Sequence, residues 1–248
     1  MIIIKSEYDV QQIKKAAEIW KKVRTALIKN CRVGVSLNDL DGMARDIIAK
    51  NDATCSFYQY NGFSKHICIS INDQIIHGIP NDYQIKENDL ITFDVGVTYN
   101  NHVCDAAFTI NMNPDNQDNE NISKATYEAL MNAIKIAKAG NYIGDISNEI
   151  ERTANQYGYE VIRDYGGHGC GNKIHEAPLI LNYGKQHTGT KLVNNMTLCI
   201  EPMLFTKNNK YYIDKKNNWT VIASNHKQTC HWEHMILIKD DTPEILTL

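Results

Sequence analysis

Two neighbouring stretches that alternate in hydrophobicity place the strongest constraint on the fold of this chain. Leu90–Val97 and His102–Ile110 flank a turn at residues 99–101, the pattern of an antiparallel pair of strands. One acid of each strand, Asp94 or Asp105, falls on the face that carries small or polar residues. Burying a carboxylate in apolar surroundings is costly unless a cation meets it. The pair therefore predicts a metal site or a basic partner, although this stretch alone slightly favours a salt-bridged acid beside a turn acid.

Helical patterns occur as two pairs, one on each side of these strands. The first helix follows a capping pattern at Ser6 and ends near Asn30, and the second follows Ser36. The other two are expected at about 123–139 and 145–157, after the polar stretch 111–120. The order helix, helix, strands is thus repeated. It predicts an α+β fold with a sheet covered on one side, in one domain of residues 1–248 whose similar halves span about 1–118 and 119–248.

Charge and cysteine content narrow the functional classes. The chain has 26 basic and 29 acidic residues and a net charge of −3, which predicts no nucleic-acid site and no polybasic membrane anchor. Its seven cysteines form no CxxC pair and lie mostly in apolar runs, so we expect reduced core thiols. The apolar run near the start is too short for a signal peptide, and no stretch approaches a membrane span. We expect a cytoplasmic protein.

Three later stretches add further candidates for chemistry. Glu201 in the run LCIEPM and Glu233 in CHWEHMILI each fall on the small or polar face of a β pattern. His168 and His175 lie in GGHGCGNKIHEAP, whose glycines match neither common nucleotide-binding loop. His77 precedes a glycine and stands close to a proline. A single histidine of this kind is more often structural, so its importance depends on what it faces.

The four acids in β contexts, Asp94, Asp105, Glu201 and Glu233, pose one electrostatic problem. Buried together, they cannot all stay ionised without compensating positive charge. Lys173 is the nearest basic residue that could reach inward, whereas two divalent cations would supply the charge directly. An oxygen-rich set with one imidazole suits Mn, Fe, Co or Zn and lacks the thiolates of a structural zinc site. Each acid alone has an ordinary structural explanation, but the ordered set with His168 favours a dinuclear metal centre.

Taken together, these segments closely resemble bacterial type I methionine aminopeptidase, of peptidase family M24. The matching segments are 64–80, 91–105, 167–178, 199–203 and 232–238. The resemblance spans nearly the whole chain and implies the pita-bread fold, with two pseudo-symmetric halves around a dinuclear metal site. It also implies that Asp94 chelates one metal ion and that Asp105 and Glu233 bridge both. His168 and Glu201 would complete the ligand set of the other ion.

The same resemblance implies roles for residues around the metal site. His77 and His175 would contact the scissile amide, and Glu201 would move the proton of the attacking water. Tyr60, Phe63, Cys68 and Trp219 would form the methionine pocket. The chain departs from the family pattern at Ile174, where an aromatic residue is common.

The expected function is metal-dependent removal of the initiator methionine from nascent proteins whose second residue is small, by a monomer acting at the ribosome. One alternative is a proline-specific peptidase of the same fold, although such enzymes usually carry an additional N-terminal domain. Another is a catalytically silent peptide-binding module, which would be expected to have lost metal ligands. A third alternative is a purely structural protein, but in such a protein nothing would compensate the negative charges of the four buried acids.

Overall fold

The computed structural model describes residues 2–208 and 210–248. The first part of the chain forms α1 (Glu7–Asn30), α2 (Leu37–Ala49), β1 (Thr54–Cys55), a 3-10 turn (Tyr60–Gly62), β2 (Cys68–Ile71), β3 (Gln74–Ile76), β4 (Leu90–Tyr99) and β5 (His102–Asn111). Next come α3 (Gln117–Ile136), α4 (Ile143–Gln156), β6 (Tyr159–Val161), β7 (Gly166–Gly169), β8 (Glu176–Leu181) and β9 (Thr197–Ile200). The chain ends with β10 (Met203–Thr206), β11 (Tyr211–Ile213), β12 (Val221–Ala223), β13 (Cys230–His231), β14 (His234–Leu237) and β15 (Glu244–Ile245).

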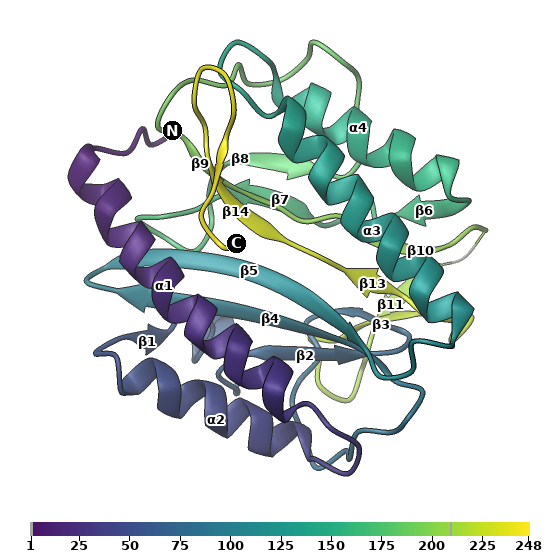
Figure 1. The fold of residues 1–248 in the computed structure, drawn as a ribbon. Helices are drawn as coiled ribbons and strands as arrows, with labels where there is room; N and C mark the ends of the chain where they lie inside the picture. Colours follow the sequence, from purple (N-terminus) through teal and green to yellow (C-terminus); the bar gives the residue numbers. More distant parts are fainter. Residues whose placement is uncertain (1, 209) are drawn as a thin grey trace.

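The strands form small antiparallel sheets. Strand β4 pairs with β5 on one edge and with β1 and β2 on the other, and a five-stranded sheet runs β15-β14-β9-β7-β8. Two further sheets run β13-β10-β6 and β11-β12-β3. In Figure 1 the pair α1 and α2 lies across the first sheet, and α3 and α4 lie on the same side of the molecule over the second. The predicted α+β architecture, with helices on one side of the sheets, is confirmed.

The predicted strand pair forms with the expected alternation. Strands β4 and β5 pair from Leu90 opposite Asn111 to Tyr99 opposite His102. Only Asn100 and Asn101 remain in the turn, both with positive φ of 46° and 61°, which is the conformation of the favoured two-residue hairpin turns. The turn is therefore tighter than the three residues expected.

Helix α3 begins six residues earlier than the predicted start at residue 123. The side chain of Asn116 accepts hydrogen bonds from the backbone N–H groups of Asp118 and Asn119, which caps the helix. Acidic residues in the first turn suit the positive end of the helix dipole. Much of the polar stretch 111–120 is thus a cap and a first helical turn. The single-domain organisation and the boundary of its halves near residue 118 stay predictions.

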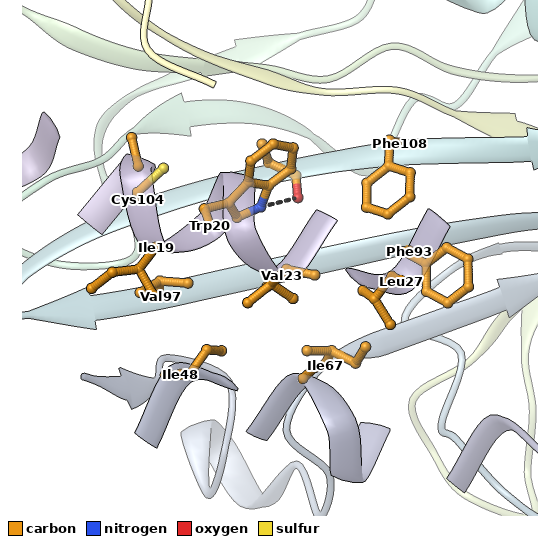
Figure 2. Close-up of a cluster of buried hydrophobic side chains, with 14 of the residues drawn as sticks. Ile19, Trp20, Val23, Leu27, Ile48, Ile67, Phe93, Val97, Cys104 and Phe108 are labelled. Carbon is orange, nitrogen blue, oxygen red and sulfur yellow. Dashed lines mark hydrogen bonds between the residues drawn. The ribbon is translucent and has the colours of Figure 1, made fainter. Parts of the chain in front are cut away.

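Helix α1 is anchored at both its cap and its buried face. The Ser6 hydroxyl accepts from the N–H of Asp9 while the Asp9 carboxylate accepts from the N–H of Ser6, so the predicted capping box is present. Figure 2 shows Trp20 of this helix packed toward Phe108, with its indole N–H donating to a strand β5 carbonyl, Ala106 O, over 3.1 Å. This packing fixes the back of the sheet, so the opposite face is free to carry chemistry.

Two other sequence expectations can be compared with the structure. Every cysteine is a free thiol, and all except Cys55 are buried, as expected for core thiols. Within the described residues, no helix combines the length and the apolar character needed to cross a membrane.

Candidate active site

A cavity of about 670 Å³ lies between residues of β2, β4 and β5 and residues of later segments, among them β7 and β10. Every residue to which the sequence analysis assigned a role lines this cavity. These residues are Tyr60, Phe63, Cys68, His77, Asp94, Asp105, His168, His175, Glu201, Trp219 and Glu233. Residues far apart in the chain are therefore gathered around one space.

The five expected metal ligands project into the cavity, some from within strands and others from the segments between strands. Asp94 of β4 lies opposite Ala107, and Asp105 of β5 lies opposite Gly96, so both carboxylates leave the hairpin from the same face. His168 lies on β7. Glu201 and Glu233 do not lie within strands: Glu201 follows β9 and Glu233 falls between β13 and β14. Strand ends and interruptions turn these two side chains into the cavity.

The four carboxylates are crowded together, with Asp105 and Glu233 buried and Asp94 and Glu201 partly buried. Burial raises the pKa of Asp94 from 3.8 to about 7, and the neighbouring Glu201 adds to the rise. Burial and then carboxylate repulsion also raise the pKa of Asp105 and of Glu233 well above their ordinary values. Without added positive charge, these groups therefore hold protons at pH values where ordinary acids are ionised.

Glu201 behaves differently from the other three acids. Its burial favours the neutral form, but the rings of His231 and His168 outweigh that effect and lower its pKa below 4.5. Glu201 Oε1 lies 3.6 Å from His168 Nε2, and Glu201 Oε2 lies 3.4 Å from His231 Nε2. Glu201 is thus the acid of the set that the protein itself holds ionised.

Unpartnered oxygens indicate that the set fits cations. In the described part of the chain, Asp94 Oδ1, Asp105 Oδ1 and Glu233 Oε1 are buried without a hydrogen-bond partner. Among those same residues, Asp105 and Glu201 pair with histidines, whereas Asp94 and Glu233 form no ion pair; Lys173 is exposed and pairs with none of the four acids. Native structures rarely leave such oxygens unpaired. The donor set, carboxylate oxygens with one imidazole, matches divalent transition metals.

The orientation of His168 also suits a ligand. Its Nδ1 lies 3.0 Å from the carbonyl oxygen of Gly169, and because a carbonyl only accepts, Nδ1 carries the proton. In the neutral ring that a metal ion binds, the lone pair is then on Nε2, which lies 3.9 Å from Asp105 Oδ2. A backbone carbonyl that fixes the tautomer in this way is the usual partner of a metal-binding histidine.

Two side chains near the acids were missed by sequence reasoning. Cys199 contributes to a group in which one potential ligand atom each of Asp105, His168, Cys199 and Glu233 lies within 4.8 Å of the others. Burial raises the pKa of its thiol well above 9.0, so it enters the site as a neutral thiol rather than a thiolate. His231 is buried against Glu201. Cys199 and His231 each stand two residues before an acid, so alternation would place them on the same faces as Glu201 and Glu233, the one signal that could have identified them.

His77 and His175 stand at the cavity outside this ligand group. The His77 ring meets Tyr165 and Trp219 edge to face, with ring centroids 5.6 and 5.9 Å away. Burial lowers its pKa to about 4. The pKa of His175 also falls to about 4, through desolvation and the adjoining His168. Both rings are neutral at pH 7 and can each donate one N–H.

Backbone geometry holds His77 in place. Its φ is +58°, in the left-handed region that is costly for a residue with a side chain. The following Gly78 passes so close to β2 that an added Cβ would lie 2.2 Å from the carbonyl oxygen of Ile69. The strained residue is therefore locked between a tight strand crossing and the cavity.

An apolar compartment adjoins the polar groups. Phe63 and Trp219 contact edge to face at 5.3 Å, and Cys68 lies opposite Asp94 in the pairing of β2 with β4. Sequence reasoning did not assign several other lining residues, namely Phe57, Ile76, Tyr165, Leu179 and Met203. They come from separate loops and strands without a shared motif, so only the tertiary structure brings them to the cavity.

Comparisons with known proteins agree with this geometry. The family model described as metallopeptidase family M24 matches residues 11–240. The methionine aminopeptidase of Mycoplasmoides gallisepticum is 43% identical over 251 residues, covering 100% of both chains. A crystal structure of methionine aminopeptidase from Rickettsia prowazekii matches with a TM-score of 0.97 at 32% identity, again over 100% of both chains.

A more distant likeness concerns the fold alone. Prolidase from Pyrococcus furiosus matches with a TM-score of 0.80 at 24% identity, covering 99% of this chain and 65% of that chain. The full-length matches to methionine aminopeptidases are closer in both sequence and extent. The chain therefore belongs to metallopeptidase family M24, and within it to the methionine aminopeptidases of the pita-bread fold.

Proposed function

We propose that this protein is an aminopeptidase that hydrolyses the peptide bond after an N-terminal methionine. The observation that carries the proposal is the meeting of two buried carboxylates, Asp105 and Glu233, two partly buried ones, Asp94 and Glu201, and His168 at the wall of a cavity with an apolar compartment. The full-length likeness to methionine aminopeptidases supports the same reaction.

Membership of family M24 indicates divalent metal ions. We propose two of them, drawn from Co, Mn, Fe or Zn, with Asp94 on one ion, Asp105 and Glu233 shared, and His168 and Glu201 on the other. The unpartnered oxygens of Asp94, Asp105 and Glu233 support this arrangement. Bound divalent ions would lower the pKa of water toward neutrality and polarise the attacked carbonyl.

The residues of the chain would perform the remaining steps. Glu201, which the adjacent histidines keep ionised, would accept the proton of the attacking water and pass it to the departing amine. The Tyr60 hydroxyl lies 2.9 Å from His175 Nδ1. If this hydroxyl donates, the proton of the neutral ring is on Nε2, which can stabilise the developing oxyanion. His77, also neutral, would donate to or orient the scissile amide.

The apolar compartment would hold the methionine side chain. Phe63, Cys68 and Trp219, with Tyr60 at the edge, present aromatic and sulfur surfaces that suit an unbranched thioether. Phe57 and Met203 extend this surface. Selectivity for methionine would follow from the shape of this compartment rather than from a charged contact.

The wider setting follows from the family resemblance. We infer nascent polypeptides as substrates, a small second residue, action in the cytoplasm near the ribosome, and a monomeric enzyme. The net charge of −3 gives no general affinity for nucleic acid. Any docking on the ribosome would therefore depend on local surfaces.

The decisive experiment measures release of free methionine from Met-Gly-Met, first with a chelator and then with added Mn or Co. Pro-substituted and Leu-initiated peptides serve as controls. The proposal expects cleavage of the Met-Gly peptide alone, abolished by the chelator and restored by metal. Cleavage only before proline would identify a proline-specific peptidase instead. Metal binding without any cleavage would identify a silent peptide-binding module.

A further inference from the structure

A buried ion pair joins Glu176, which lines the cavity, to Lys5 and takes no part in the mechanism above. Lys5 Nζ donates to Glu176 Oε2 over 2.6 Å, and the two side chains are 1% and 3% exposed. A buried pair of this kind adds little net stability, because removing both charges from water offsets their attraction. Its presence next to a functional segment therefore calls for another explanation.

The second carboxylate oxygen of Glu176 binds the backbone of the loop that precedes this residue. Glu176 Oε1 accepts from the backbone N–H groups of Asn172 and Lys173, over 2.6 and 2.8 Å. One carboxylate thus draws two amides of the loop and the Lys5 ammonium to the same point. These three contacts satisfy a charge that would otherwise be costly at this depth.

Lys5 is itself held from several sides. Its backbone N–H donates to the carbonyl oxygen of Asn195 over 2.9 Å, and its ammonium also donates to the carbonyl oxygen of Ile3 over 3.2 Å. Its stem passes so close to Gly171 that an added Cβ there would lie 2.5 Å from Lys5 Cε. The lysine is thus a fixed point rather than a mobile surface charge.

The loop tied down in this way carries His175. That ring lies 4.4 Å from the ring of His168, centroid to centroid, and its Nδ1 meets the Tyr60 hydroxyl. His175 is itself exposed to the cavity, so packing alone does not define its position. Its backbone is continuous with Glu176, the residue that the buried pair immobilises.

We propose that the Lys5–Glu176 pair is a positioning device for His175, an inference that rests on the role of His175 in the proposed function. The pair holds the backbone of residues 172–176, and through it the imidazole, in line with the scissile bond. Neither Lys5 nor Glu176 touches the reacting atoms in this scheme. Removing the pair should therefore slow turnover without emptying the metal site.

The first test compares Lys5→Met with Lys14→Met in the full chain loaded with Mn, using Met-Gly-Met as substrate. Lys14 forms a pair of the same length, 2.6 Å, with Glu244, but that pair is 41% and 36% exposed. Lys5→Met should lower kcat by about 10- to 100-fold, the usual effect of a small misplacement of a catalytic group. KM and metal content should change less than about twofold. Lys14→Met should match the unchanged enzyme.

A coupling experiment separates positioning from a general structural effect. In a His175→Ala background, adding Lys5→Met should cause no further loss of kcat, because the group that the pair positions is already absent. An equal further loss in that background would overturn the inference. Full turnover of Lys5→Met beside a slow His175→Ala would also overturn it, and would leave the proposed function intact. Full turnover of His175→Ala would overturn both the role of His175 and this inference.

Lys5→Met leaves the buried Glu176 carboxylate without its cation, and this variant could fail to fold for that reason alone. A second comparison covers this case. Lys5→Met/Glu176→Gln and Lys5→Met/Glu176→Leu both remove the buried charge. Only glutamine offers an oxygen to the N–H groups of Asn172 and Lys173. The glutamine variant should keep most of the turnover, and the leucine variant should lose about tenfold or more in kcat. Equal turnover of the two folded variants would overturn the inference.

Discussion

At the scale of single residues, the site depends on acids that the folded chain alone does not neutralise. Asp94, Asp105 and Glu233 each keep an oxygen without a partner in the described part of the chain. Glu201, by contrast, is paired with histidines. This division fits the proposed roles, in which all four acids hold the metal ions and Glu201 also moves a proton.

Replacing Asp105 or Glu233 with alanine should abolish metal binding and activity, because each is the proposed shared ligand. Metal content after gel filtration, measured by mass spectrometry, should fall from the native value toward zero. Glu18→Ala, at an exposed position on helix α1, is the matched control and should retain metal. Activity of either variant in metal-free buffer would contradict the mechanism.

His77→Ala should leave the metal content unchanged and lower kcat by roughly 100-fold, the usual contribution of one acid–base or hydrogen-bonding group. The physical reason is that the neutral ring lies outside the ligand group yet faces the cavity. Parallel metal counts and steady-state kinetics check this. Loss of metal together with activity would instead make His77 part of the ligand set.

Asp9→Asn should remove a pH-dependent part of the stability. Hydrogen bonds from Ser6 and then His102 lower the pKa of Asp9 from 3.8 to about 2. A lowered folded-state pKa stabilises the protein above pH 3.8, and this contribution is lost as the pH falls through about 2. The side chain is partly exposed, so we expect on the order of 1 kcal/mol at pH 6. Urea unfolding at pH 6 and pH 2.5 should show the difference shrinking, with the exposed Asp115→Asn as control.

At the scale of secondary-structure elements, close backbone approach decides where functional side chains lie. An added Cβ on Gly167 of β7 would lie 2.2 Å from the carbonyl oxygen of Cys199 on β9. The absence of a side chain there lets the two strands pair, and that pairing sets the position of the adjoining His168.

Gly167→Ala should therefore destabilise the protein by about 1–3 kcal/mol, the usual cost of overpacking, and weaken metal binding. Gly42→Ala is the matched control: Gly42 lies in helix α2, where an added Cβ meets nothing within 4 Å. At this position the substitution should raise the free energy of unfolding by about 0.5–1 kcal/mol. Thermal unfolding of both variants measures the contrast. Equal effects would show that β7 and β9 can separate without cost.

At the scale of the whole molecule, metal binding should be linked to stability and to pH. In the metal-free protein the folded-state pKa values of Asp94, Asp105 and Glu233 lie above their ordinary values. A raised folded-state pKa stabilises the folded protein at pH values below the ordinary pKa of the acid. This contribution is lost as the pH rises through the folded-state pKa, which is about 7 for Asp94. Bound cations would replace the lost protons.

The unfolding temperature of the chelator-treated protein should therefore fall between pH 5 and pH 8 through these groups. Added Mn should raise the unfolding temperature more at pH 8 than at pH 5, because deprotonated carboxylates bind the ion. Scanning calorimetry at both values measures this, and Glu233→Gln should show a smaller metal effect. A metal-induced rise in unfolding temperature that is equal at pH 5 and pH 8 would argue against the proposed ligand set.

Local sequence patterns were sufficient for the hairpin and for the acids on it. Strict alternation in residues 90–110 determines which face each side chain occupies, so the pattern alone placed Asp94 and Asp105 on the correct face. The start of α3 was missed because a run rich in Asn, Asp and Pro is typical of both a linker and a helix cap. The capping role of Asn116 depends on how the following turn is packed.

The sequence by itself determined which residues are candidates for the metal site and the order of the elements, since alternation and capping are local properties. Only the tertiary structure decided that Glu201 and Glu233 project from strand interruptions, and that Cys199 and His231 join the acids. It also decided that Lys5 reaches Glu176, 171 residues away. Contacts between segments so far apart leave no periodic signal in the chain, because they are set by how the sheets pack rather than by neighbouring residues.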